Sequence, residues 1–219
     1  MAKLLLNADG KVLTSNDKVL KAPESTLKKL LDAKKSAYNL FYGYQGTSID
    51  DLISYNDTEN VTNMYGMCDG CDNLITFPQL NTGKVTNMYL MCQDCKNLIY
   101  IKLDTINTTN LQNTFAYCSK LQTIDLSSLD KVTNISRFAD SCYSLNKFIV
   151  REMTKLPILS TDSFKNCHHF TGTVHSKYNP EGLKDGRIYI PDDFVEQLKQ
   201  ATNWSVYADI IVPLSTLGE

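Results

Sequence analysis

The chain has 219 residues, of which 42% are hydrophobic and 21% charged, and its formal net charge is −2 at pH 7. This composition is typical of a folded globular protein. No stripe of Lys and Arg is visible, so we expect no nucleic-acid partner. No apolar run approaches the ~18 residues of a membrane span, so we expect no membrane insertion. The run Leu4–Leu6 is too short for the core of an export signal and Asp9-Gly10 interrupts it, so no signal peptide is visible.

Residues 1–24 are predicted to form short strands. Asp9-Gly10 lies between two apolar runs and is a hairpin signal, and Asn16-Asp17 marks a second turn. Pro23 closes the segment. Because this part does not match the repeat that follows, we interpret it as an N-terminal strand or attachment segment, through which copies of the chain could form a homo-oligomer.

Residues 25–60 are predicted to form a helical capping repeat. Ser25 can cap the first turn of a helix, and apolar residues then recur at three- and four-residue spacing, which places them on one face. These residues are Leu27, Leu30, Leu31, Ala37, Leu40 and Phe41. Phe41 and Tyr44 align with positions of the later repeat, so the segment is interpreted as a degenerate first copy with the polar outer face that a terminal repeat needs.

Residues 61–173 contain a repeated unit. It begins with Val61-Thr62-Asn63-Met64 and continues with Cys68, Cys71 and Leu74. The same order starts again at Val85, Thr108, Val132 and, more weakly, Pro157. The second cysteine of the unit recurs every 23 to 25 residues, at Cys71, Cys95, Cys118, Cys142 and Cys167. A fixed period in this range indicates a solenoid, in which each copy stacks on the next.

Each copy is predicted to have two parts. The first part has apolar residues three or four apart, which predicts a short helix or a helical turn capped by Thr or Asn. The second part is a short strand with inward apolar residues, such as Ile101 and Leu103, and the strands of successive copies should form a parallel ladder. The first copy departs from this pattern, because Pro78 cannot donate a hydrogen bond to a ladder.

Residues 174–219 are predicted to form a C-terminal cap over the last copy. Residues 175–186 are rich in turn signals and should form a loop. A strand is predicted at 187–190, a helix at 191–198 and a last strand at 209–213.

The seven cysteines leave three alternatives. Cys68, Cys71, Cys92 and Cys95 form two CxxC pairs, which is the ligand spacing of a zinc site. Disulfide or redox use is the second alternative. The third, which we favour, is a set of buried reduced thiols, because five cysteines recur at one slot per copy and the other two occupy a slot that is apolar in later copies. We therefore expect no metal and no cofactor.

Cys167 lies beside His168-His169 and near His175, which raises the alternative of a nucleophile with a base. No orienting third group can be assigned to these residues, and Cys167 already has a place in the cysteine column. We therefore expect no catalytic residues and no enzymatic activity.

The repeated unit, with its Val-Thr-Asn-Met start, its cysteine slots and its Leu-x-x-Ile strand, resembles the BspA-like leucine-rich repeats of bacterial surface proteins. The closing segment, 188–192 followed by 201–209, is similar to the terminal segment of this family in gut bacteria and bacteriophages. The resemblance covers residues 37–215. It implies an α/β fold, namely a leucine-rich-repeat solenoid wound as a right-handed superhelix, with one short parallel strand and one short helix per 23–25-residue repeat and with N- and C-terminal caps. It also implies a role in adhesion or protein interaction, and it brings no catalytic residues.

The side chains that flank the inward residues of the ladder are predicted to form one continuous binding face, as solenoid surfaces commonly do. The candidates are Thr76, Tyr100, Lys102, Thr123, Asp125 and Lys147. Tyr100 is the favoured anchor, because a tyrosine ring buries a large area at a low entropic cost. The alternative is that these side chains form an ordinary solvated face.

The leading hypothesis is a non-enzymatic repeat module that binds a protein or a cell-surface glycan, on a bacterial surface or a bacteriophage particle. The alternative is a virion structural or scaffold subunit that assembles through residues 1–24. The repeat pattern leaves the ligand, the host and the oligomeric state open.

Overall fold

The computed structural model describes residues 14–15, 18–19 and 24–218. The strands are β1 (Thr14–Ser15), β2 (Lys18–Val19), β3 (Tyr100–Leu103), β4 (Thr123–Ser128), β5 (Lys147–Glu152), β6 (Arg187–Ile190) and β7 (Ile211–Pro213). The α-helices are α1 (Glu24–Lys34), α2 (His168–Thr171) and α3 (Val195–Gln200). The 3-10 helices are η1 (Tyr55–Thr58), η2 (Asp192–Phe194), η3 (Ser205–Tyr207) and η4 (Leu214–Thr216).

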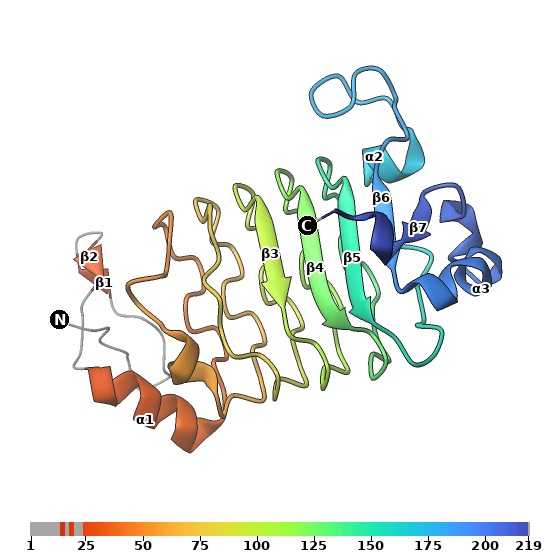
Figure 1. Ribbon diagram of the computed structural model, residues 1–219. Coiled ribbons are helices and arrows are strands. Elements are labelled where there is room, and N and C mark those ends of the chain that lie inside the picture. Colours follow the sequence, from red (N-terminus) through yellow and green to blue (C-terminus); the bar gives the residue numbers. More distant parts are fainter. Residues whose placement is uncertain (1–13, 16–17, 20–23, 219) are drawn as a thin grey trace.

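The described residues form an α/β fold around one parallel sheet with the strand order β3-β4-β5-β6-β7. Figure 1 shows these strands side by side in chain order. The register aligns inward residues in straight columns, one of which is Ile101, Ile124, Phe148, Ile188 and Ile211. Every member of this column is at most 2% exposed. The period-two alternation of the strands therefore decides which face packs on the core.

The segments that begin Val-Thr-Asn-Met and the turns after them form a second wall. Asn63, Asn87, Asn110 and Asn134 make successive parallel bridges. Beyond each bridge, alternate backbone N–H groups donate to the neighbouring copy, for example from Met64 to Asn87 (2.9 Å) and from Cys68 to Met91 (2.7 Å). The N–H groups between them donate to the carbonyl three residues back. Backbone hydrogen bonds therefore join the copies along this wall as well as along the sheet.

Of the two forms predicted for the first part of each copy, the short helix is wrong and the turn is present, because this wall consists of turns. Two residues in the N-terminal copy and in each of the next four copies have left-handed backbone angles, which end any helix after one turn. The first position is held by Asn39, Gly66, Leu90, Asn113 and Arg137, and the second by Gly43, Gly70, Asp94, Tyr117 and Ser141. The N–H groups of these residues donate to an adjacent copy instead of to their own segment, as Gly66 does to Tyr89 (2.9 Å).

The predicted Thr and Asn side chains do cap these segments, but they cap turns. Asn63 Oδ1 accepts a hydrogen bond from the N–H of Tyr65 (3.1 Å), and the same bond recurs in three later copies. Thr86 Oγ1 donates to the carbonyl of Thr62 in the preceding copy (3.2 Å), and this bond also recurs. Asn commonly stabilises a turn in this way, by accepting from the backbone two residues on.

The prediction that the cysteines are buried packing residues is confirmed. All seven are buried and free, and the thiols of the column donate to backbone carbonyls of earlier copies, from Cys71 to Phe41 (3.0 Å) and from Cys118 to Cys92 (2.9 Å), for example. Burial raises the pKa of Cys118 and Cys142, so both thiols stay protonated at neutral pH. A neutral, buried thiol is a poor nucleophile.

The N-terminal copy differs from the prediction in the length of its helix. α1 begins at Glu24, one residue before Ser25, and ends at Lys34, because Lys35 has a left-handed φ of 48°. Ala37 and Phe41, predicted on this helix, lie instead in turns that stack on the first full copy, with their N–H groups donating to Asn63 and Met67 (2.8 and 2.7 Å). Phe41 still occupies its predicted slot, since its carbonyl accepts the Cys71 thiol.

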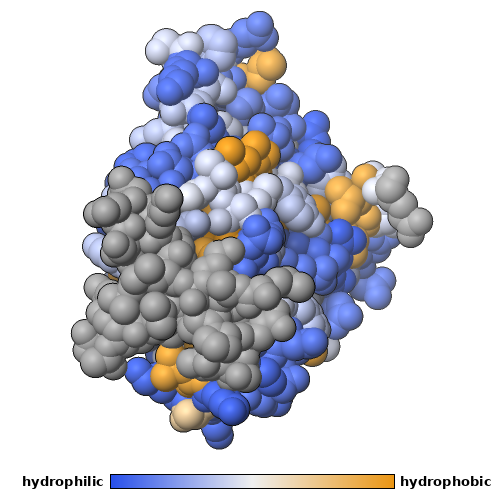
Figure 2. All heavy atoms as spheres, turned by 90° about the vertical axis from the view of Figure 1, so that its left-hand side faces the viewer, coloured by the Kyte–Doolittle hydropathy of each residue, from blue (hydrophilic) through white to orange (hydrophobic). Residues whose placement is uncertain are grey.

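Only part of the prediction for residues 1–24 falls within the described residues. β1 and β2 pair antiparallel, which agrees with the predicted short strands. The turn predicted at Asn16-Asp17 lies outside the described residues. The hairpin predicted at Asp9-Gly10 lies outside the described residues. Figure 2 views the molecule from this end, and the surface not drawn in grey is mainly hydrophilic with small, separate hydrophobic areas.

The two ends of the ladder are formed differently. In the first full copy Thr76 makes only an isolated bridge to Tyr100, which agrees with the expected effect of Pro78. At the other end, the predicted loop, strand, helix and last strand are present, but β6 and β7 also extend the parallel sheet. The buried Trp204 ties this region to the last copy by donating from its indole N–H to Pro157 (2.9 Å). The last copy is therefore covered by further strands as well as by helices.

Candidate binding face

We call the solvent side of β3, β4, β5 and β6 the outer face. The register arranges its side chains in rows that cross the strands. The first row is Thr76, Tyr100, Thr123, Lys147 and Arg187, the second is Lys102, Asp125, Ile149 and Tyr189, and the third is Ser127 and Arg151. These positions alternate along each strand with the buried columns of the core.

Five of the six predicted binding residues are accessible on the outer face. Thr76, Tyr100, Lys102 and Lys147 are exposed, Tyr100 at 48%, and Thr123 is half-buried. Because Thr76, Tyr100, Thr123 and Lys147 follow one another in a single row, the fold brings together residues that lie 71 positions apart in the sequence.

Asp125 is the exception and corrects the prediction. It is 2% exposed, so a ligand cannot reach it directly. Its two carboxylate oxygens accept from Nε and Nη2 of Arg151, at 2.9 and 2.7 Å. This is the bidentate geometry that makes an arginine–carboxylate pair strong, and it raises the pKa of Arg151.

Sequence reasoning missed Arg151. On this strand the candidates ended at Lys147, although alternation with period two places residue 151 on the same face. Arg151 is part of the outer face both as the partner of Asp125 and as a side chain that is 42% exposed.

A hollow opens where β3 and β4 end. It is lined by Tyr55, Gln79, Leu80, Asn81, Thr82, Lys102, Leu103, Asp104, Ser127 and Arg151. Tyr55 comes from η1 and is 50% exposed. Asp104 accepts a hydrogen bond from Ser127 Oγ (2.8 Å). The hollow therefore places Lys102 and Arg151 of the outer face beside the aromatic ring of Tyr55 and the amide side chains of Gln79 and Asn81.

The C-terminal segment limits the outer face on its other side. η4 contacts β5, and in Figure 1 the end of the chain runs in front of β6 and β5 toward β4. Ser215 holds this segment to the Asp192 carboxylate through its Oγ (2.6 Å) and its N–H (3.1 Å). Ile149 points outward from β5 and is nevertheless only 4% exposed, as expected beneath such a cover.

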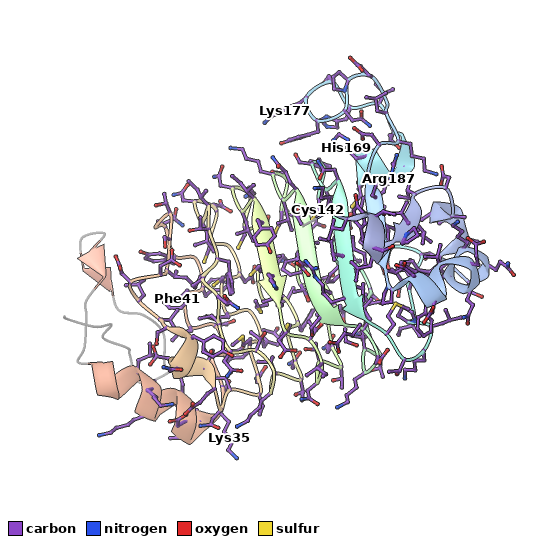
Figure 3. The ribbon with its side chains drawn as sticks, viewed as in Figure 1. Lys35, Phe41, Cys142, His169, Lys177 and Arg187 are labelled. Carbon is purple, nitrogen blue, oxygen red and sulfur yellow. The ribbon has the colours of Figure 1, made fainter. Side chains whose placement is uncertain are left out.

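The open part of the outer face carries more cations than anions. Lys102 and Lys147 are exposed, and neither has a hydrogen bond or ion pair with another described side chain. Arg187, which Figure 3 labels at β6 beside β5, donates from Nη1 to its neighbouring carbonyl at Gly186 (2.8 Å). A surface with this charge distribution attracts anionic groups.

A separate cluster of rings lies near the loop 172–185, where Figure 3 labels Lys177. Tyr143 stacks on His168 (5.2 Å between ring centroids) and His175 lies 4.9 Å from His168. Burial lowers the pKa of His168, and neither of its ring nitrogens has a hydrogen-bond partner among the described residues. The thiol of Cys167 donates to the Ala139 carbonyl (3.1 Å) and not to an imidazole, so it is not paired with a base as a catalytic thiol would be.

The described part of the chain has neither a cluster of metal-binding side chains nor a helix suited to cross a membrane. Within residues 14–15, 18–19 and 24–218, no group of three or more His, Cys, Asp or Glu side chains is placed to hold a metal ion. In the same ranges, no helix combines the length and the apolar character needed to cross a membrane.

Comparison with known proteins gives a match to a protein family. The family model described as "Mycoplasma protein of unknown function, DUF285" matches residues 35–151 and, in a second overlapping match, residues 75–178. No curated protein and no solved structure matches the chain.

Proposed function

Because the chain belongs to the DUF285 family, we propose a function that resides in the part this family covers: a non-enzymatic recognition module that binds a protein or a cell-surface glycan through its outer face. In this proposal the copies form a leucine-rich-repeat solenoid of the BspA-like kind, with turns in place of the expected helices. The module acts on a bacterial surface or a bacteriophage particle.

The solenoid part of the proposal is supported by the two backbone ladders. Copies that recur every 23 to 25 residues are joined on one side by the parallel strands β3, β4 and β5 and on the other by the asparagine bridges. In such an arrangement each copy packs only on its neighbours, and one side of every copy contributes to a continuous surface.

The single observation that carries the recognition role is the row Thr76, Tyr100, Thr123 and Lys147. Four different copies supply it, and Tyr100 at its centre exposes 48% of its surface. An exposed aromatic ring beside polar and cationic side chains resembles the composition of protein-binding surfaces, where tyrosine and arginine are enriched and dominate the binding energy.

The test is to present the full chain to printed arrays of glycans and of extracellular proteins and then to measure the dissociation constant of each ligand found. Tyr100→Ala should weaken binding by about tenfold or more, the effect of removing a central aromatic anchor. The matched control is Tyr42→Ala, because Tyr42 is similarly exposed (55%) but belongs to the wall of turns.

Equal losses in the two variants, or no loss in either, would place the binding site away from the outer face. A chain that binds no ligand but forms a defined oligomer, lost when residues 1–24 are removed, would favour the virion structural or scaffold subunit instead.

A further inference from the structure

We propose that the outer face binds an acidic oligosaccharide, that is, a chain of sugar rings bearing carboxylate or sulfate groups. This inference rests on the recognition function proposed above and names the class of ligand for the same surface.

The charges of the outer face favour an anionic ligand. The positions on β3, β5 and β6 present Lys102, Lys147, Arg151 and Arg187. Asp125 is buried and already paired with Arg151. The exposed carboxylates beside the face are Asp104, which lines the hollow, and Asp50, which accepts a hydrogen bond from Thr76 Oγ1 (3.4 Å). The four basic side chains outnumber these two carboxylates, and Lys102 and Lys147 have no carboxylate partner among the described residues. The whole chain has a net charge of −2, and the accumulation of cations on this face is therefore a local feature that attracts anions against the overall charge.

The polar groups of the face favour sugar rings over a peptide. Tyr100 and Tyr55 expose about half of their surface, and an exposed aromatic ring can stack on the apolar side of a sugar ring. Gln79 and Asn81 in the hollow and Thr123 in the first row add amides and a hydroxyl that can pair with sugar hydroxyls.

A peptide needs other features. Docked peptides use apolar anchors that enter apolar pockets, or they add a strand to a free sheet edge. The hollow has only two aliphatic residues, Leu80 and Leu103, among its ten lining residues. The outer-face residue Ile149 is buried. The backbone groups of β4 and β5 are used in pairing with strands on both sides. β3 is an edge of the sheet, with only the isolated bridge of Thr76 beyond it, so a strand could be added there. The middle of the outer face, over β4 and β5, offers a peptide neither an apolar pocket nor a free edge.

The spacing of the face sets the size of the ligand. Lys147 lies two strands from Tyr100 in the same row, a separation of about 10 Å at the usual strand spacing. Lys102 lies two positions along β3 from Tyr100, about 7 Å away. A ring stacked on Tyr100 can bring its own acidic group to Lys102, whereas Lys147 meets the acidic group of a neighbouring ring. The ligand is therefore longer than one sugar.

The experiment uses the full chain and four probes. Two are acidic oligosaccharides, a polygalacturonate fragment that carries carboxylates and a heparin fragment that carries sulfates. The others are a neutral maltooligosaccharide of the same length and a polyglutamate peptide. Binding is measured by calorimetry at low and at physiological salt. One or both acidic oligosaccharides should bind, and affinity should fall as salt rises, because ionic contacts at an exposed surface are screened. Comparison of the two acidic probes then tells a carboxylate preference from a sulfate preference.

Three variants identify the site. Lys102→Gln and Lys147→Gln should each weaken binding by about two- to fivefold, the effect of losing one exposed ion pair. Lys35→Gln is the matched control, because Lys35 is also exposed but lies at the end of α1, away from the sheet (Figure 3). It should leave the affinity unchanged.

The outcomes separate this inference from the function on which it rests. If the neutral oligosaccharide or the polyglutamate peptide binds best, and Tyr100→Ala abolishes that binding, the acidic-sugar inference is overturned while the recognition function stands. If the acidic oligosaccharides bind but Lys102→Gln and Lys147→Gln act no differently from Lys35→Gln, the inference is also overturned. If none of the probes and no array ligand depends on Tyr100, the proposed function itself fails.

Discussion

Removing Arg151 should destabilise the protein more than removing Arg137, although both arginines pair with a buried aspartate. Asp125 and Asp140 have side chains that are 3% and 4% exposed, and their arginines are 42% and 41% exposed. The two ion pairs are therefore matched in burial. They differ in what remains for the carboxylate once the arginine is gone.

Asp125 has hydrogen bonds from Arg151 only, among the described residues. Breaking a buried pair by removing one partner costs roughly 3–5 kcal/mol, because it leaves an uncompensated charge. Since Arg151 is partly exposed, water can enter where its side chain was, and we expect Arg151→Ala to cost about 2–3 kcal/mol.

Asp140 keeps two other donors after Arg137→Ala, which are Ser141 Oγ (2.9 Å) and Asn166 Nδ2 (3.3 Å). The loss should therefore be about 1 kcal/mol, the net value of one hydrogen bond to a partly exposed group. The Arg137 guanidinium also donates from Nη2 to the Tyr117 hydroxyl and contacts the Tyr117 ring, and both interactions add little because the two groups are exposed.

The assay is urea unfolding at pH 7, followed by circular dichroism and by the fluorescence of Trp204, the only tryptophan in the chain. Asp125→Val in the Arg151→Ala background should return stability to within about 1 kcal/mol of the parent, since replacing a whole buried pair by apolar residues is often neutral. The reasoning is refuted if Arg151→Ala costs no more than Arg137→Ala, or if Asp125→Val does not rescue it.

Three further predictions concern the wall of turns and the buried titratable groups. Gly43→Ala should lower the free energy of unfolding by about 1 kcal/mol, because Gly43 has a left-handed φ of 67°. Gly66→Ala should lower it by about 2 kcal/mol, because a methyl group there also meets the side chain of Asn39. Thermal unfolding of the two variants tests this difference. Burial raises the pKa of Asp69 to about 6, above its ordinary 3.8, so stability falls as pH rises between these values. Asp69→Asn should raise the free energy of unfolding at pH 7.5 by about 1 kcal/mol, after allowance for solvent, and leave it unchanged at pH 3.5, as urea unfolding at the two pH values would show. Burial lowers the pKa of His168, so the protein loses stability as pH falls below the ordinary value of 6.5. His168→Phe keeps the stacking on Tyr143 and should reduce the difference in melting temperature between pH 8 and pH 5. If that difference does not shrink, other groups cause the pH dependence.

The period of the chain and its buried columns could be predicted from the sequence. The cysteine slot and the inward residues of the strands, such as Ile124 and Phe148, recur at fixed intervals. Equivalent positions in stacked copies have equivalent neighbours, so a repeated apolar residue predicts a repeated buried one. For the same reason the cysteines could be recognised as packing residues in spite of their CxxC spacing.

The choice between a helix and a turn could not be made from this pattern. Met64, Met67, Cys68 and Cys71 are spaced three or four apart, and this spacing buries the same residues in either conformation. Hydrogen bonds to the adjacent copy favour the turn, and they require left-handed angles at residues such as Leu90 and Tyr117, which have no strong intrinsic preference for them. A tertiary interaction therefore overrode a local signal.

The sequence alone determined which residues alternate between the core and the outer face, because that alternation is a property of any strand. Only the tertiary structure decided which side chains of the outer face are accessible and which strands complete the sheet. Asp125 was predicted to be accessible, and it is buried because Arg151, 26 positions later, covers and pairs with it. β6 and β7 were predicted as strands, but their places in the sheet depend on pairing across a loop that carries no repeat. Contacts between distant parts of the chain leave no periodic trace in the sequence, and these contacts decide which side chains are exposed on the outer face.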